Sequence, residues 1–208
     1  MIGIIGGTFD PIHLGHLRPA LEIAEIFSFN ELRFIPSANP PHRWKPEASA
    51  EHRLEMVKLA TKNEPVFNVD DREYHREGPS FTIDTIRSIR NEIGNEHPLC
   101  MIIGLDAFQS FTKWRDWQNI LELTHLLVSS RPGYDQMQKE QWADRYRTEN
   151  VKSIQQKPSG HIYFIDVTQL DISATFIREQ IKLGNSSRYL TTHAVHEYLL
   201  RNELYETK

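Results

Sequence analysis

The stretch that decides the fold is Gly6-Gly7-Thr8-Phe9-Asp10-Pro11-Ile12-His13-Leu14-Gly15-His16 (6–16). It follows an apolar run, residues 1–5, that is typical of a buried strand. It precedes an amphipathic stretch with Leu14, Leu17 and Leu21 at helical spacing. A glycine-rich turn between a first strand and a first helix is where open parallel sheets bind nucleotides. The helix N-terminus there offers unpaired N–H groups and the positive end of its dipole. The sequence therefore predicts a nucleotide site at the front of an α/β fold.

Two histidines, His13 and His16, stand three residues apart at the start of the predicted helix and share one face. A phosphate bound at that helix end would meet both imidazoles. The spacing excludes a P-loop, because no Gly-Lys-Ser/Thr follows, and the third glycine of a dinucleotide fingerprint is also missing. The structural alternative is that Gly6 and Gly7 only permit a tight turn and that the histidines face water.

A second motif, Ile172-Ser173-Ala174-Thr175-Phe176-Ile177-Arg178 (172–178), follows a strand-like run over residues 162–167. Ser173 is a candidate N-cap for the helix that begins there. The hydroxyls of Ser173 and Thr175, the free N–H groups of the first turn and the Arg178 guanidinium predict a second polyphosphate cradle. Taken alone, the same residues would make an ordinary capped helix with a solvated arginine.

Together the two motifs resemble those of the nucleotidyltransferase superfamily, whose His-x-Gly-His signature has a related form in class I aminoacyl-tRNA synthetases. The longer form, 6–16, is similar to that of the bacterial nicotinate-mononucleotide adenylyltransferases, and the resemblance covers nearly the whole chain. In that family an Ile-Ser-x-Thr-x-Ile-Arg segment faces the His-x-Gly-His loop across the ATP phosphates. The resemblance implies catalytic roles for His13, His16 and Arg178. It implies ATP-binding roles for Gly6, Gly7, Thr8, Phe9, His13, His16, Gly104, Asp106, Ile172, Ser173, Thr175 and Arg178.

Further segments resemble the acceptor side of the same family. Residues 36–43 resemble its Pro-Pro-His-Lys/Arg loop, and residues 78–85 resemble its Pro-Ser-Tyr-Thr segment, with Ser80 as a candidate cap of the next helix. The family stacks the pyridine ring on a tryptophan at the position of Trp114. Arg115 stands where the family often has an aromatic residue. The resemblance and the strand-end positions give these substrate-binding candidates: Ser37, His42, Arg43, Thr82, Asp106, Trp114, Arg115 and Arg131.

The helix predicted after Ser80 also predicts a preference for an acidic acceptor. Its first-turn N–H groups, its dipole, and the hydroxyls of Thr82 and Thr85 favour an anion. A carboxylate pocket tolerates no nearby acid, so Asp84 is expected to face another direction. We therefore predict that nicotinate mononucleotide is preferred over nicotinamide mononucleotide.

The composition supports one domain over residues 1–208, because strand-like and helical runs alternate without a linker or repeat. This pattern predicts an α/β, Rossmann-like fold with a doubly wound parallel sheet. A net charge of −4 disfavours binding to nucleic acid. The single cysteine, Cys100, lies in an apolar strand and indicates a reduced, cytoplasmic protein, and no signal peptide or membrane span is apparent. The polar stretch 134–160 is predicted to be a solvated helix and loop. Oligomeric state stays open.

The resemblance implies that nicotinate mononucleotide attacks the α-phosphorus of ATP in line, giving deamido-NAD and pyrophosphate. Mg²⁺ would neutralise the pyrophosphate while bound by phosphates and water, so no protein metal site is predicted. Nicotinamide mononucleotide, phosphopantetheine or another phosphate remains open as the acceptor. A nucleotide-binding regulator without turnover is the alternative from another class. A synthetase fragment is disfavoured, because residues 172–178 do not form a Lys-Met-Ser-Lys-Ser loop.

Overall fold

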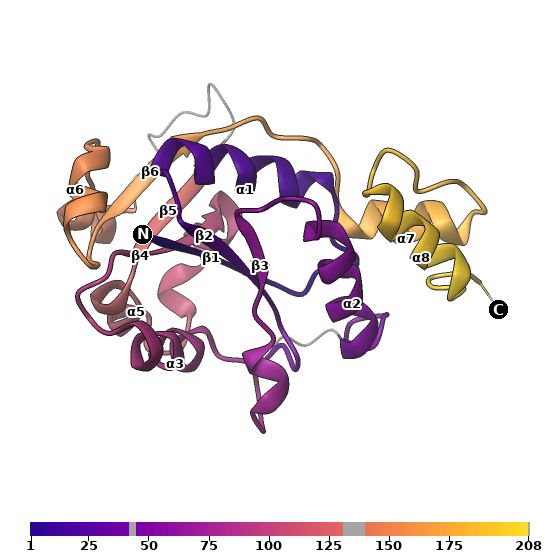
Figure 1. Ribbon diagram of the computed structural model, residues 1–208, viewed down its shortest axis with the longest axis horizontal. Helices are drawn as coiled ribbons and strands as arrows, with labels where there is room; N and C mark the ends of the chain where they lie inside the picture. The colour runs from indigo at the N-terminus through magenta and orange to yellow at the C-terminus, as the bar shows by residue number, and fades with distance from the viewer. Residues whose placement is uncertain (42–44, 131–139, 208) are drawn as a thin grey trace.

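The centre of the molecule is a sheet of six parallel strands in the order β3-β2-β1-β4-β5-β6 (Figure 1). The computed structural model describes residues 1–41, 45–130 and 140–207. The order reverses at β1, from which the chain winds outward in both directions, so the prediction of a Rossmann-like, doubly wound α/β fold is confirmed. The strands are β1 (Ile2–Gly7), β2 (Glu31–Pro36), β3 (Phe67–Val69), β4 (Leu99–Gly104), β5 (His125–Ser130) and β6 (Ile162–Asp166).

Both faces of the sheet are buried, which explains why its central strands are apolar without alternation. In β4, Leu99 and Met101 point into one hydrophobic cluster, whereas Cys100 and Ile102 point into the other. Figure 1 shows α1 on one side of the sheet and α3 and α5 on the opposite side. The helices are α1 (Leu14–Phe27), α2 (Ala50–Thr61), α3 (Thr82–Ile93), α4 (Leu105–Gln109), α5 (Trp117–Leu123), α6 (Val151–Gln156), α7 (Ala174–Lys182) and α8 (His193–Arg201). Short 3-10 turns cover Arg72–His75, Phe111–Lys113 and Gln141–Tyr146.

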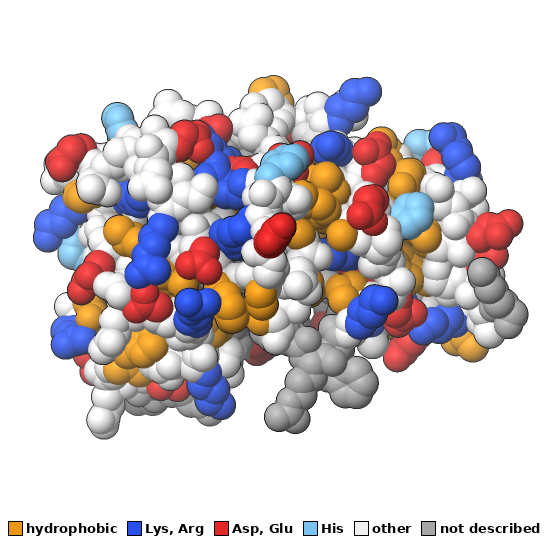
Figure 2. Space-filling view, turned by 90° about the horizontal axis from the view of Figure 1, so that it is seen from below, with side chains coloured by type: hydrophobic (Ala, Val, Ile, Leu, Met, Phe, Trp, Pro, Cys, Tyr) orange, Lys and Arg blue, Asp and Glu red, His pale blue; other side chains and the backbone are white. Residues whose placement is uncertain are grey.

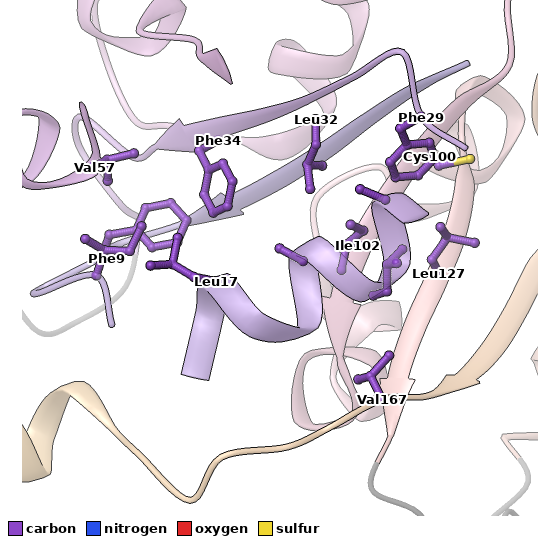
Figure 3. Packing of buried hydrophobic residues seen from close by; sticks show 14 of the residues in the cluster. Phe9, Leu17, Phe29, Leu32, Phe34, Val57, Cys100, Ile102, Leu127 and Val167 are labelled. Carbon is purple, nitrogen blue, oxygen red and sulfur yellow. The ribbon is translucent and has the colours of Figure 1, made fainter. Parts of the chain in front are cut away.

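The packing of α1 against the sheet fixes the place of the first motif. Leu17 lies between the helix and the strands, close to Phe9 and Phe34 (Figure 3). At the other end of the cluster, the ring of Phe29 packs so closely over β1 that a Cβ at Gly3 would collide with it. Gly3 therefore lets the chain that leaves α1 return closely to the sheet.

The prediction of a solvated helix and loop over 134–160 holds for most of the described part, 140–160, which is exposed or half-buried and contains a 3-10 turn and the short α6, but it fails for the apolar residues. Ala143 and Ile154 are buried, and the Trp142 ring packs edge-on against Trp117 with centroids 4.9 Å apart. Apolar residues are sparse here and divided between a 3-10 turn and the short α6, so no helical periodicity marks them in the sequence.

The surface agrees with the modest net charge. Figure 2 shows acidic and basic side chains interspersed over one face of the molecule, with small apolar areas between them. Among the described residues, no helix is both long and apolar enough to cross a bilayer. Helices α7 and α8 lie together at one end of the molecule, beside α2 (Figure 1).

Candidate active site

A cavity of about 960 Å³ lies at the carboxyl ends of the central strands β1, β2, β4 and β5. Its position follows the rule that open α/β sheets bind ligands beyond the carboxyl ends of their strands, next to the reversal of strand order. Its size is at the upper end of the range for small-molecule sites. The predicted residues that line it are Gly6, Gly7, Thr8, Phe9, His16, Ser37, Thr82, Gly104, Asp106, Trp114 and Arg115. His42, Arg43 and Arg131 lie outside the described residues.

The first motif turns the chain from β1 into α1. Phe9 has a left-handed φ of 50°, and His13 is the residue immediately before α1. The imidazoles of His13 and His16 stack with ring centroids 3.7 Å apart, and His13 N donates to His16 Nδ1 at 3.3 Å. His13 is buried, and its Nδ1 has no hydrogen-bond partner among the described residues. The two rings therefore meet at the N-terminus of α1, as predicted.

Both of these histidines are neutral at pH 7. Burial lowers the pKa of His13 to about 4. Burial, and then the charge of the neighbouring His13, lower the pKa of His16 well below its usual value. Two imidazolium rings in this stack would repel one another, whereas a neutral imidazole still offers one N–H donor to a phosphate.

The second motif lies against the first without lining the large cavity. The Ile172 carbonyl comes so close to Gly15 that a Cβ there would lie 3.2 Å from the oxygen, so only glycine fits easily between the two segments. Arg178 Nη1 donates to the Asp10 carbonyl at 2.7 Å, and its Nε donates to Glu47 at 2.9 Å. Ile172 thus lies beside Gly15 and Arg178 beside Asp10, whereas Ser173 and Thr175 are exposed, and none of these four residues lines the cavity.

Ser173 is the N-cap of α7, as predicted, because its hydroxyl accepts the N–H of Phe176 at 3.1 Å. The predicted cap at Ser80 is wrong. Residue 81 is the N-cap of α3, and Ser80 Oγ accepts the N–H of Asn39 at 3.1 Å. The Ser80 hydroxyl thus accepts an N–H forty-one positions away in the sequence and not one from the first turn of α3. Ser80 thereby joins the loop after β2 to the start of α3.

Asp10 is a buried hub that the sequence analysis missed. Its carboxylate accepts the N–H groups of Glu47 (2.8 Å) and Ala48 (3.1 Å) and the hydroxyl of Tyr205 (2.7 Å). Burial and the Asp10 charge raise the pKa of Tyr205, which stays protonated and donates. Asp10 therefore joins the first motif to the start of α2 and to the segment after α8. An aspartate inside the motif was the available signal, but its partners are remote in the sequence.

The cavity wall beside the start of α3 contains an acid that the sequence analysis also missed. Glu73 is buried, lines the cavity, and accepts the hydroxyl of Thr85 at 2.6 Å on Oε1. Its Oε2 has no partner among the described residues. Thr85 therefore donates to Glu73, so a buried acid besides Asp84 stands near the helix N-terminus that was expected to favour an anion. Thr82, the first residue of α3, remains on the cavity wall.

Arg115 and Trp114 also line the cavity. The Arg115 guanidinium stands 4.5 Å from the centroid of the Phe81 ring and 4.0 Å from Asp84. Asp84 therefore faces this arginine, which offsets its charge. The Trp114 ring is half-buried and packs against Phe111 with centroids 5.4 Å apart, which leaves part of the indole at the cavity.

The described residues contain no group of three or more His, Cys, Asp or Glu side chains that could hold a metal ion. Two carboxylates, Glu73 and Asp106, line the cavity. The donors at this site are instead histidines, hydroxyls, helix N-termini and arginines, which suit anionic ligands.

A Rossmann-like sheet with paired histidines at the start of its first helix, opening on a cavity at the strand ends, defines a nucleotidyltransferase. Comparison with known proteins agrees. The cytidylyltransferase-like family model matches residues 4–180. A chain of Yersinia enterocolitica named "probable nicotinate-nucleotide adenylyltransferase" is 44% identical over 209 residues, covering 99% of this chain and 95% of the relative. A protein of Hahella chejuensis with the same name is 42% identical over 208 residues, covering 98% and 95%.

Solved structures show the same fold. The Plasmodium falciparum nicotinic acid mononucleotide adenylyltransferase complexed with NaAD superposes with a TM-score of 0.74 at 17% identity, covering 98% of this chain and 96% of that one. The chain belongs to the nicotinate-nucleotide adenylyltransferases of the cytidylyltransferase-like family. The resemblance predicted from residues 6–16 and 172–178 is thereby confirmed.

Proposed function

We propose that the chain transfers the adenylyl group of ATP to nicotinate mononucleotide by direct in-line attack, in NAD biosynthesis. A bond forms between an acceptor phosphate oxygen and the α-phosphorus, the bond from that phosphorus to the α–β bridging oxygen breaks, and pyrophosphate leaves. The observation that carries this proposal is the stacked pair His13 and His16 at the N-terminus of α1, beside the cavity. The attacking phosphate is already anionic, so the protein needs no general base and contributes positioning and charge stabilisation.

The two histidines and the N-terminus of α1 stabilise the charge that develops around the α-phosphorus. Because both imidazoles are neutral in the free protein, each enters as an N–H donor. An approaching triphosphate favours the protonated form, since an opposite charge raises a histidine pKa. Binding of a triphosphate would therefore promote protonation of the two histidines, which makes the site more positive.

Arg178, with Ser173 and Thr175, holds the β and γ phosphates. In the free protein the Arg178 guanidinium donates to Glu47, which also pairs with Lys182 at 2.8 Å. A triphosphate carries more charge than one carboxylate and accepts bidentate donation from arginine. ATP would thus take the place of Glu47 as the partner of Arg178, while the bond to the Asp10 carbonyl keeps the side chain in position.

On the acceptor side, the pyridine ring stacks on Trp114 and its carboxylate meets the N-terminus of α3 at Thr82. Arg115 adds positive potential that Asp84 partly offsets. Glu73 also lines the cavity, and the Thr85 hydroxyl donates to its Oε1. Ser37, Asp106, His42, Arg43 and Arg131 are proposed, from the family resemblance, to complete the contacts to the nucleotides.

Mg²⁺ is proposed as the cofactor of ATP. Mg²⁺ usually keeps several waters and binds through substrate phosphates with one or two carboxylates, and the cavity offers Asp106 and Glu73. This donor set fits an ion carried mainly by the triphosphate. When bound, the ion would neutralise charge on the leaving pyrophosphate.

The proposed partners are small molecules, with neither nucleic acid nor a membrane among them, and the proposed location is the cytoplasm. The mixed surface charge and the buried, unpaired Cys100 support this proposal.

The test is release of pyrophosphate from Mg-ATP by the purified chain with three acceptors: nicotinate mononucleotide, nicotinamide mononucleotide and phosphopantetheine. Nicotinate mononucleotide is the acceptor expected to support turnover. His16→Ala should lower kcat about 10² to 10³-fold, the usual effect of losing one transition-state donor. His193→Ala is the matched control, because His193 is a surface residue at the start of α8, and it should keep wild-type kcat. Turnover with another acceptor alone, or near-wild-type kcat in folded His16→Ala, would refute the proposal.

A further inference from the structure

Arg53, on α2, is buried beneath the loops that line the cavity, although it belongs to neither motif. Its relative exposure is 1%. Nη1 donates to the carbonyl oxygens of Thr8 at 2.9 Å and Ser37 at 2.6 Å, and Nη2 donates to that of Ala38 at 3.2 Å. Thr8 follows β1 and Ser37 follows β2. One guanidinium therefore ties together the loops at two neighbouring strand ends.

The hydrogen bonds continue from these loops to α3. Asn39 N donates to Ser80 Oγ at 3.1 Å, and Ser80 N donates to the Asn39 carbonyl at 2.8 Å. Ser80 stands two positions before Thr82, the first residue of α3. A continuous path thus runs from Thr8, on the ATP side of the cavity, through Arg53 to the acceptor side.

Arg53 also brings a positive charge that has no carboxylate partner among the described residues. None of the ion pairs formed there includes it. Its Nε likewise has no hydrogen-bond partner in that part of the chain. A buried charge is screened less than a surface charge, so it acts over a longer distance. Its sign matches a cavity that receives phosphates.

We propose that Arg53 is a positioning residue that sets the distance between the ATP side and the acceptor side of the cavity. This inference rests on the proposed adenylyl transfer. In-line attack requires the acceptor oxygen and the α-phosphorus to be held at a fixed distance and angle, and a displacement of about 1 Å can lower the rate about 10²-fold. Loss of the three-carbonyl clamp should therefore lower kcat more than it raises either KM.

Arg90 provides a matched control at the opposite edge of the sheet. It is buried on α3 and donates to the carbonyls of Leu123 (2.8 Å), His97 (2.7 Å) and Pro158 (2.8 Å). These carbonyls lie near the amino ends of the strands, remote from the cavity. Arg53 and Arg90 are thus both buried and both donate to backbone carbonyls. The partners of Arg53 lie in loops beside the cavity, whereas those of Arg90 lie far from it.

The experiment compares Arg53→Lys with Arg90→Lys, each assayed well below its own melting temperature. Lysine keeps the charge, but one ammonium cannot reproduce the planar fork that spans three carbonyls. Arg53→Lys should lower kcat about 10 to 100-fold, with both KM values within about threefold of wild type. Arg90→Lys should lose thermal stability and keep kcat within about twofold. Wild-type kcat in Arg53→Lys, or a rise confined to one KM, would overturn the proposal. Absence of pyrophosphate release by the wild-type chain would instead refute the proposed function.

Ser80→Ala tests the same path if Arg53→Lys does not fold. This variant removes the acceptor for Asn39 N–H while every hydrogen bond of Arg53 is retained. It should lower kcat about tenfold with little change in either KM. An unchanged kcat in folded Ser80→Ala would show that the path does not set the geometry of the reaction.

Discussion

Replacing Tyr205 with phenylalanine removes a single hydroxyl from the Asp10 hub. That hydroxyl donates to Asp10 Oδ1 at 2.7 Å, and both side chains are buried. The phenylalanine ring would fill the same space, so the change isolates the hydrogen bond from the packing. Asp10 would keep the N–H groups of Glu47 and Ala48 as donors.

A hydrogen bond to a charged group contributes about 1.5–3 kcal/mol to stability. Because two donors remain on Asp10, we expect the free energy of unfolding to fall by about 2 kcal/mol. For a chain of this length each kcal/mol corresponds to roughly 2–4 °C. The melting temperature of Tyr205→Phe should therefore fall by about 4–8 °C.

The assay is thermal unfolding followed by circular dichroism at pH 7.5, with Tyr198→Phe as the control. The Tyr198 hydroxyl lies 2.8 Å from His52 Nδ1 and also joins α8 to α2, but it is half-buried and its partner is a histidine. Its loss should cost about 1 kcal/mol or less, a shift of roughly 2–4 °C or less. A shift for Tyr205→Phe no larger than that of Tyr198→Phe would refute the assignment of Asp10 as a charged hub.

Trp114→Ala should raise KM for nicotinate mononucleotide at least about fivefold, since stacking is worth on the order of 1 kcal/mol, and leave KM for ATP within about twofold; separate titrations of the two substrates check this. The kcat/KM for nicotinate mononucleotide should exceed that for nicotinamide mononucleotide by about 10² or more, because the amide would leave protein donors that bind the carboxylate unpaired. Equal values would show that Thr82 does not form a carboxylate pocket. Stability should fall as pH drops from 6.5 to about 4, because burial holds the pKa of both His13 and His125 at about 4 while the unfolded chain takes up protons first. Melting temperatures across that window test this, and His125→Asn should flatten the curve; a melting temperature independent of pH would contradict it.

The parts of the site that follow from local patterns could be predicted from the sequence. The first motif needs only a strand, a turn and a helix in succession, and the stacked histidines follow from spacing on that helix. Ser173 caps its helix through a bond to a residue three positions away. These contacts are set within a few residues, so periodicity and capping rules reach them.

The parts that sequence reasoning missed depend on partners far along the chain. Serine is a common helix cap, but the Ser80 hydroxyl instead accepts a hydrogen bond from Asn39 N in the loop after β2. Arg53 has charged neighbours in the sequence, so the sequence suggests an exposed side chain. In the structure it is buried and donates to three backbone carbonyls. Glu73 lies on a 3-10 turn, and its burial follows from where α3 packs. Tertiary packing decided each case.

The bond between Asp10 and Tyr205 has a consequence for the order in which the molecule is assembled. Its ends are 195 positions apart, whereas β6, the last strand of the sheet, ends at Asp166. A growing chain that has just passed Asp166 already contains every strand, but it lacks Arg178 and Tyr205, the two side chains that bind Asp10 from the C-terminal side. Domains fold as units while contacts of long sequence separation close late. The Asp10 hub therefore cannot be complete when the strands of the sheet have all been synthesised, and it closes only after Tyr205 has been added.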